Sequence, residues 1–195
     1  MKTTKKLTLL SLLFLTSFCH SYAQESEKKV SPVRFLIKGA FEFGGDDVAE
    51  VYFTNGDKQS VKAGQGVSIA IGGELQTPGV EKLLFHTTVG FKYVTTQADN
   101  VHIRLTRVPI HVTANWMVTK KLRLGAGLAT HQAIRFKADG LMQDISFAGA
   151  TGPMVELAYR GIGLTYTAMT YYDQDRHSYS ANAIGLAFAF TIPKR

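Results

Sequence analysis

The last regular segment of the chain alternates strictly between large apolar residues and small ones. From Ile184 onward, every second residue is large and apolar: Ile184, Leu186, Phe188, Phe190 and Ile192. The residues between them are small: Ala183, Gly185, Ala187, Ala189 and Thr191. Because successive side chains of a strand point to opposite faces, this period of two predicts a strand with one apolar face.

The same period recurs in eight segments, at 33–44, 65–76, 82–96, 101–118, 121–136, 150–160, 162–172 and 182–192. Each is long enough to cross a bilayer as a tilted strand, which takes about 9–11 residues, whereas strands of water-soluble proteins are more often about 5–6 residues long. No segment after residue 23 approaches the roughly 18 consecutive apolar residues of a membrane-spanning helix. The pattern therefore favours strands that cross a membrane.

The connections between these segments alternate in length. They are short at 77–81, 119–120 and 160–161, and longer at 45–64, 137–149 and 173–181, while 97–100 is a short exception. Short turns on one side and longer loops on the other are typical of outer-membrane barrels. The sequence thus predicts an all-β fold over 33–195, a single antiparallel eight-stranded up-and-down transmembrane β-barrel, with the termini and short turns in the periplasm.

The loop 45–64 contains its own turn signal. Asn55-Gly56 is the residue pair that a type I′ hairpin turn prefers, and short strand-like runs flank it. These arms are too short to cross a membrane, so we expect a hairpin that protrudes from the barrel mouth. A ten-stranded barrel is the alternative.

The N-terminus has the layout of a secretory signal peptide. Basic Lys2, Lys5 and Lys6 precede an apolar run at 7–18, and a small residue, Ala23, marks the expected cleavage site. We expect residues 1–23 to be removed and 24–32 to form a short lead into the barrel. Removal takes away three lysines, which lowers the net charge from +7 to +4. It also takes away the only cysteine of the chain. A cysteine-free mature chain needs no disulfides, and no basic run with interleaved aromatics argues for nucleic acid.

The polar face of the predicted strands carries charges of both signs. An eight-stranded barrel has interior room only for side chains, and buried charges persist only when they are paired. We therefore expect a filled lumen with a polar network of Arg34, Lys38, Glu42, Glu74, Lys92, Arg107, Arg123, Arg135 and Glu156. Three histidines, His86, His111 and His131, fall on the same face.

Two further patterns refine this barrel. In 101–118 the apolar positions switch from odd to even near Thr106-Arg107, which predicts a β-bulge beside Pro109. Aromatic residues gather toward the strand ends, as interfacial girdles do. They are Phe35, Phe85, Trp116, Tyr159 and Phe190 on the turn side, and Phe43, Tyr93, Phe136 and Tyr172 on the loop side.

These features resemble the small eight-stranded outer-membrane proteins of Gram-negative bacteria, the class that holds OmpX, OmpW and the OmpA membrane domain. Gly185, Phe188 and Phe190 are similar to the glycine-x-x-aromatic-x-aromatic signal of the barrel assembly machinery, although this chain continues to Arg195 where members usually end on an aromatic. Stretches 44–47, 54–57 and 63–66 resemble a group of uncharacterised outer-membrane barrels. The resemblance implies a monomer in contact with outer-membrane lipid and lipopolysaccharide.

No motif in the chain carries catalytic chemistry. The histidines lack a metalloenzyme spacing. The segment 176–182 resembles the His-x-Ser-Asn neighbourhood of lipid A deacylases, but Tyr179 occupies the serine position. Asp46-Asp47 and Asp173-Asp175 have the oxygen ligands that calcium prefers, although solvated loop carboxylates are far more common. We expect no catalytic residue, cofactor or bound metal.

Three functions follow from this pattern. The first is a non-enzymatic envelope protein with a structural or surface-interaction role. The second is a narrow channel for small or hydrophobic molecules, and the third is a lipid-modifying enzyme. The absence of a catalytic motif and the predicted filled lumen favour the first.

Overall fold

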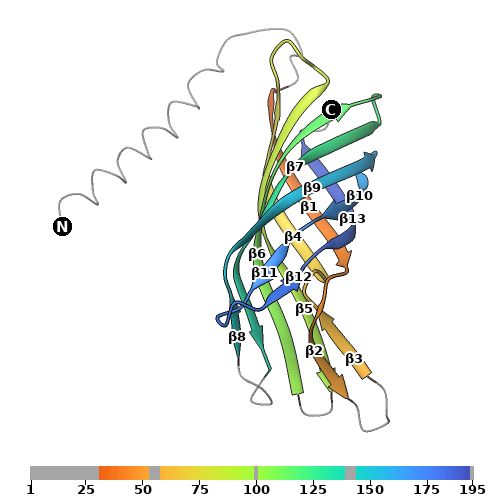
Figure 1. Ribbon diagram of the computed structural model, residues 1–195. Coiled ribbons are helices and arrows are strands. Elements are labelled where there is room, and N and C mark those ends of the chain that lie inside the picture. The colour runs from red at the N-terminus through yellow and green to blue at the C-terminus, as the bar shows by residue number, and fades with distance from the viewer. Residues whose placement is uncertain (1–30, 53–57, 99–100, 139–143, 194–195) are drawn as a thin grey trace, which may run out of the picture. The chain divides into compact units, whose positions relative to one another are not determined.

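A computed structural model describes residues 31–52, 58–98, 101–138 and 144–193 of the chain (Figure 1). The expected signal peptide, 1–23, and most of the expected lead, 24–32, lie outside these ranges. The described strands are β1 (Val33–Phe43), β2 (Asp47–Tyr52), β3 (Lys58–Lys62), β4 (Gly66–Gln76), β5 (Leu83–Ala98), β6 (Val101–Met117), β7 (Leu122–Lys137), β8 (Ile145–Phe147), β9 (Ala150–Tyr159), β10 (Ile162–Thr167), β11 (Thr170–Tyr172), β12 (Ser178–Ser180) and β13 (Ala183–Ile192).

Eight of these strands close into one antiparallel barrel. Its order is β1, β4, β5, β6, β7, β9, β10 and β13, and β13 pairs with β1 to complete the circle. This confirms the predicted fold class, an outer-membrane type of eight-stranded barrel. Within the described ranges, no helix has the length and apolar character that crossing a membrane requires.

The predicted strands match the observed ones to within a few residues, with one break. The segment expected at 162–172 divides into β10 and β11, with Ala168 and Met169 between them. There the backbone N–H of Met169 donates to the Asn182 side-chain oxygen at 2.8 Å. β2 and β3 pair in a separate two-stranded sheet at the positions of the expected hairpin arms, and the expected turn, Asn55-Gly56, lies outside the described residues.

The two ends of the barrel differ. Short connections at 77–82, 118–121 and 160–161 join the strands at one end, which we call the turn end. Both described chain ends lie there, because Phe35 is paired with Ile192 and the backbone of Gln76 donates to Pro32. The opposite, loop end carries the β2–β3 and β11–β12 sheets (Figure 1).

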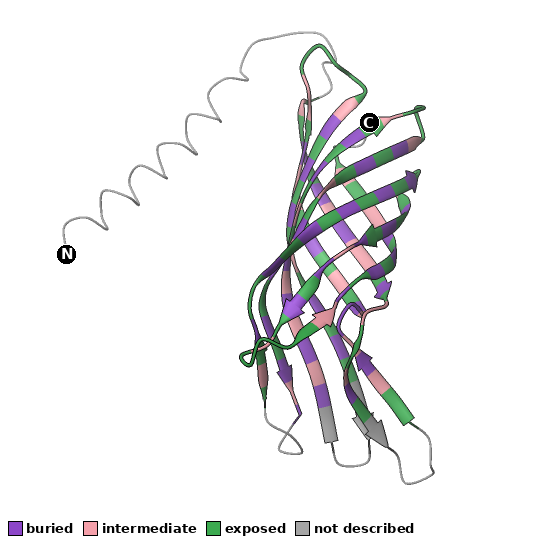
Figure 2. Ribbon diagram, viewed as in Figure 1, coloured by how far each residue is buried: buried purple, intermediate pink, exposed green. Residues whose placement is uncertain are grey.

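The outer surface of the barrel is apolar along most of its height. Side chains alternate between buried and exposed along each strand, most regularly along β9 (Figure 2). Large apolar groups form the exposed set, with Phe190 65% and Ile69 64% exposed. We call this outward face of the eight barrel strands the belt. It carries the expected girdle residues Phe35, Phe85, Trp116, Tyr159 and Phe190 at the turn end, and Phe43 and Tyr93 toward the loop end.

Three neighbouring strands, β5, β6 and β7, are much longer than the rest and extend beyond them at the loop end (Figure 1). There the interior is apolar. We call the buried cluster around Val61, Ile103, Leu105, Ile134, Phe136, Phe147 and Tyr171 the loop-side core. Phe136, expected in the loop-side girdle, is 0% exposed within it, so that prediction was wrong.

The bulge lies at the predicted level but on the neighbouring strand. The β6–β7 register shifts between Thr106 and Val108, where two steps along β6 oppose three along β7, from Gln132 to Arg135. The extra residue on β7 accompanies Ala133, whose φ of 49° is left-handed. β6 itself keeps its odd residues inside throughout. The apolar residues of β6 are odd-numbered near the loop end and even-numbered toward the turn end, because the loop-side core is apolar whereas the lumen below it is polar.

Candidate functional site

The barrel lumen holds the largest group of buried charges among the described residues. Its members are five cations, Arg34, Lys38, Lys92, Arg107 and Arg123, and three carboxylates, Glu42, Glu74 and Glu156. Each comes from an inward position of a barrel strand, as the alternation predicts. These side chains form two groups, one toward the turn end and one toward the loop end.

The turn-end group is a continuous chain of ion pairs and hydrogen bonds. Arg34 Nε donates to Glu74 Oε1 at 2.7 Å, and His86 Nε2 lies 2.7 Å from Glu74 Oε2. Arg123 Nη1 lies 2.9 Å from His86 Nδ1, which fits a ring that donates from Nε2 and accepts at Nδ1. Arg123 also pairs with Glu156, and Lys38 Nζ lies 2.6 Å from the second oxygen of that carboxylate. Glu156 thus holds two buried cations.

The loop-end group forms hydrogen bonds to a backbone segment that crosses the lumen. Lys92 Nζ lies 3.0 Å from Glu42 Oε2 and donates to the Gly64 carbonyl at 2.7 Å. Arg107 donates to the carbonyls of Ala63 and Gln65. Two lumen cations therefore hold residues 63–65, which link β3 to β4, across the mouth of the barrel.

Glycines allow the backbone to close this mouth. Gly64 N donates to Gly44 O at 3.0 Å, and a Cβ at Gly64 would lie 2.5 Å from Asn182 O. A Cβ at Gly45 would lie 2.5 Å from Gly64 N, and the φ of Gly45 is +87°. Three chain segments thus meet at the mouth with no space for side chains. This gives a physical reason for the glycines in the 44–47 and 63–66 stretches.

The charged side chains leave little space around Lys38 and Glu42. A cavity of about 20 Å³ lies among Lys38, Glu42, His111 and Met154. That is room for about one water molecule. His131 bonds to the hydroxyl of Tyr171, a member of the loop-side core that sequence reasoning had not singled out. Tyr171 continues the alternation of β10, because Thr167, Met169 and Tyr171 are all buried, so a period of two was the signal that could have placed it inward.

Arg135 was predicted to line the lumen, but its side chain is exposed on the outside of the barrel. The extra β7 residue near Ala133 reverses the alternation, so Ile134 and Phe136 point inward and Arg135 outward. The three residues of the expected assembly signal lie on both faces of β13. Gly185 faces the lumen, where a Cβ would lie 2.7 Å from Glu42 Cγ, whereas Phe188 and Phe190 are on the belt side.

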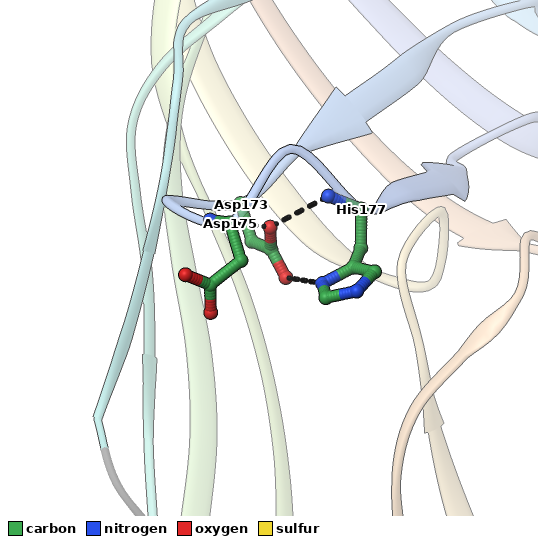
Figure 3. Close-up of side chains that lie close together, drawn as sticks. All are labelled: Asp173, Asp175 and His177. Carbon is green, nitrogen blue, oxygen red and sulfur yellow. Dashed lines mark hydrogen bonds and ion pairs between the residues drawn. The ribbon is translucent and has the colours of Figure 1, made fainter.

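A second group of chemically capable side chains lies in the loop between β11 and β12 (Figure 3). Ligand atoms of Asp173, Asp175 and His177 lie within 4.8 Å of one another, a spacing that could hold a cation. Asp173 Oδ1 already accepts the backbone N–H groups of Asp175 at 2.9 Å and His177 at 2.8 Å. Desolvation opposes ionisation of this carboxyl group, but hydrogen bonds from the backbone and ring of His177 hold the pKa of Asp173 below its ordinary 3.8. The carboxylate therefore orders the turn by itself.

Other candidate calcium ligands have structural partners. Asp46 Oδ2 accepts the backbone N–H of Ser180 at 2.7 Å, and Asp47 Oδ1 lies 3.0 Å from Lys62 Nζ. The Asp46 contact joins the start of the β2–β3 sheet to the β12 segment. The Asp47–Lys62 pair joins the two strands of that sheet. His102 lies on β6 at the loop end, but its side chain is outside the described part of the chain.

No protein-family model and no curated protein matches the chain. Among solved structures, similar folds include Ail, the attachment invasion locus protein of Yersinia pestis. It has a TM-score of 0.42 and 8% identity, over 81% of this chain and 97% of that one, and the same values hold for Ail in complex with the heparin analogue sucrose octasulfate. Neisserial surface protein A (NspA) has a TM-score of 0.40 and 13% identity, over 82% of this chain and 98% of that one. The likeness is distant.

Proposed function

We propose that this protein is a closed, non-enzymatic barrel of a Gram-negative outer membrane that anchors a folded surface for interactions outside the cell. The observation that carries the proposal is the two-level closure of the barrel. A paired charge network fills the lumen, and residues 63–65 cross its mouth, held by Lys92 and Arg107. Above them the loop-side core forms a folded body on the longest strands.

The test of closure is conductance. Residues 24–195, refolded from detergent into a planar bilayer, are expected to give no single-channel steps, because ions would have to displace paired buried charges. Reproducible steps would favour the narrow channel instead. The lipid A profile of cells with and without the gene tests the enzyme alternative, and we expect the two mass spectra to be the same.

The proposed orientation places the turn end and the termini in the periplasm and the loop end outside. Because residues 24–195 contain no cysteine, single cysteines report on each end. On intact cells a membrane-impermeant maleimide should label Lys58→Cys in β3 and should label Lys120→Cys at the turn end only after the outer membrane is permeabilised. The opposite pattern would reverse the orientation.

Insertion is expected to depend on the barrel assembly machinery. The supporting feature is the belt-side pair Phe188 and Phe190 on the last strand, which closes the barrel against β1. Phe188→Ala together with Phe190→Ala should reduce the amount of heat-modifiable protein in outer membranes, whereas Leu186→Ala on the same face should have little effect. The assembled protein is proposed to be a monomer surrounded by lipid.

A further inference from the structure

The turn end of the barrel carries a surplus of positive charge. In its connections 77–82, 118–121 and 160–161 the only carboxylate is Glu81. Four exposed cations lie in the same connections, namely Lys82, Lys120, Lys121 and Arg160. No ion pair among the described residues includes any of the four. We call these four residues the basic rim.

The connections at the loop end have the opposite balance. In 44–52, 58–65, 144–149 and 168–182 the charged residues are six carboxylates and three cations, namely Asp46, Asp47, Glu50, Asp144, Asp173, Asp175, Lys58, Lys62 and Arg176. Lys58 Nζ lies 3.6 Å from Glu50 Oε1, and Lys62 Nζ lies 3.0 Å from Asp47 Oδ1. The two loop-end lysines therefore have carboxylate partners within the protein. Within the described ranges, the cations of the basic rim have none.

The basic rim forms one continuous arc. The β4–β5, β6–β7 and β9–β10 turns follow one another around the barrel, because β5 pairs with β6 and β7 pairs with β9. The backbone N–H of Met117, at the end of β6, donates to the carbonyl of Lys82 at 2.8 Å. The backbone N–H of Arg160 donates to the carbonyl of Lys121 at 2.9 Å. Hydrogen bonds thus link each turn to the next, which brings the four cations together on one side of the turn end.

Two of these turns hold their cations on an ordered backbone. Thr119 Oγ1 accepts the backbone N–H groups of Lys121 at 3.2 Å and Leu122 at 3.0 Å, which fixes the β6–β7 turn. Arg160 has a left-handed φ of 51°, and its guanidinium lies 5.7 Å from the centre of the Tyr159 ring. Hairpin turns with a positive φ prefer Asn, Asp or Gly at this position. The β9–β10 turn therefore carries a cation where its backbone favours another residue.

The position of the lysines indicates the chemistry of a partner. Lys82 precedes the start of β5, and Lys120 and Lys121 lie between the end of β6 and the start of β7. They therefore lie beyond the belt aromatics Trp116 and Tyr159 at this end. Lysine is a strongly hydrated point charge on a flexible stem, so these side chains reach into water. An arc of such charges fits a polymer that presents carboxylates at intervals, because several weak exposed ion pairs then act together.

We propose that the basic rim binds the carboxylate groups of peptidoglycan, the anionic glycan–peptide polymer of the periplasm. The proposal rests on the proposed function, which places the turn end in the periplasm, and it adds a partner for that end. Free carboxylates of the peptide stems pair with Lys82, Lys120, Lys121 and Arg160. The contact is reversible and weakens as salt is added, because all four cations are exposed. The barrel is thus held to the cell wall at one end and presents its folded body at the other.

The experiment is cosedimentation of residues 24–195 in detergent with purified peptidoglycan sacculi. Lys120→Gln with Lys121→Gln removes two charges from the basic rim, and Lys58→Gln with Lys62→Gln removes two charges from the loop end. The two double variants have the same net charge, so a difference between them reports on position. Sacculi whose carboxyl groups have been amidated are run in parallel. Heat-modifiable gel mobility shows that each variant is folded.

The rim variant should bind sacculi about tenfold more weakly than the wild type, because two exposed ion pairs are lost. The loop-end variant should bind like the wild type, and none of the three proteins should bind amidated sacculi. Equal losses in both variants, or no loss, would overturn the proposal. So would wild-type binding to amidated sacculi. Native mass spectrometry in which bound phosphatidylglycerol depends on Lys120 and Lys121, when sacculus binding does not, would assign the basic rim to lipid instead and would also overturn it.

These outcomes are independent of the tests of the proposed function. A barrel that conducts ions or has the reverse orientation, but whose sacculus binding needs Lys120 and Lys121, would contradict the proposed function alone. A closed barrel with its turn end in the periplasm, whose sacculus binding ignores both lysines, would contradict the role of the basic rim alone.

Discussion

The two halves of β6 bury opposite kinds of side chain on the same face of one strand. Toward the turn end its inward residues include Arg107, His111 and Asn115, and the outward ones include Val112 and Trp116. Toward the loop end Ile103 and Leu105 point inward and Arg104 outward. The backbone alternation does not change between the halves, so the change in polarity reflects the medium outside. A lipid-facing wall needs apolar residues outside, whereas a water-facing wall packs them inside.

The largest effect should come from breaking the charged interior. Glu156→Gln leaves Lys38 and Arg123 buried without their shared carboxylate, and loss of one partner of a buried ion pair costs about 3–5 kcal/mol. The free energy of unfolding, followed by Trp116 fluorescence in detergent with added denaturant, measures it. The control is Glu50→Gln in the loop-end Lys58 pair, where the atoms are 3.6 Å apart and exposed, and we expect less than about 1 kcal/mol. Equal costs at the two sites would contradict the two-region account.

A somewhat smaller effect is expected in the loop-side core. Phe136→Ala removes a fully buried ring, and such truncations cost about 3–5 kcal/mol, with less expected than at Glu156 because that carboxylate pairs with two buried cations. The barrel below should remain folded, since its interior does not include Phe136. Limited proteolysis in detergent should cut the variant at the loop end while the turn-end strands stay protected. Simultaneous loss of both regions would show that the two form one cooperative unit.

An added charge on the outer wall should distinguish the lipid-facing region from the water-facing region most simply. Ala126→Arg places a charge in the middle of the lipid-facing stretch of β7, where about 2–4 kcal/mol is expected, and Ser178→Arg on exposed β12 should stay within about 0.5 kcal/mol. Refolding yield into lipid vesicles and the denaturation midpoint report the difference. If both variants behaved alike, the belt would not face hydrocarbon.

The smallest effect concerns the β11–β12 turn, which lies in the water-facing region. The pKa of Asp173 is lowered in the folded turn, so its stabilising contribution is present above the unfolded value and is lost as the pH falls through the folded one. Protection of the His177 and Asp175 amides from hydrogen exchange should therefore persist below pH 3.8 and then fall. Asp173→Asn should abolish this pH dependence, and a titration of Asp173 at or above 3.8 would contradict the assignment.

The sequence predicts the barrel well because alternation, strand length and turn length are local properties. Strand positions and the inward placement of Arg34, Lys38 and Glu156 follow from a period of two, and the hairpin arms follow from the Asn55-Gly56 turn signal. Arg135 and Phe136 could not be placed, because a single extra residue near Ala133 reverses every later position on β7. The sequence places the bulge on β6 because the apolar residues of that strand change from odd to even positions. An extra residue in β6 would produce this change, and so would an interior that is apolar at one end of the barrel and polar at the other. Contacts such as Arg107 with the carbonyls of Ala63 and Gln65 depend on how distant segments meet, which periodicity does not encode.

The most direct test of this account measures what surrounds each half of the outer wall. Spin labels at Val112→Cys on the belt and Ser146→Cys on β8, in otherwise cysteine-free protein in lipid vesicles, can be exposed to oxygen and to a water-soluble relaxation agent. The account predicts that the label at Val112 is relaxed mainly by oxygen and the label at Ser146 mainly by the water-soluble agent. A label at Val112 that is freely accessible to the water-soluble agent, or a protein that stays soluble without detergent, would contradict it.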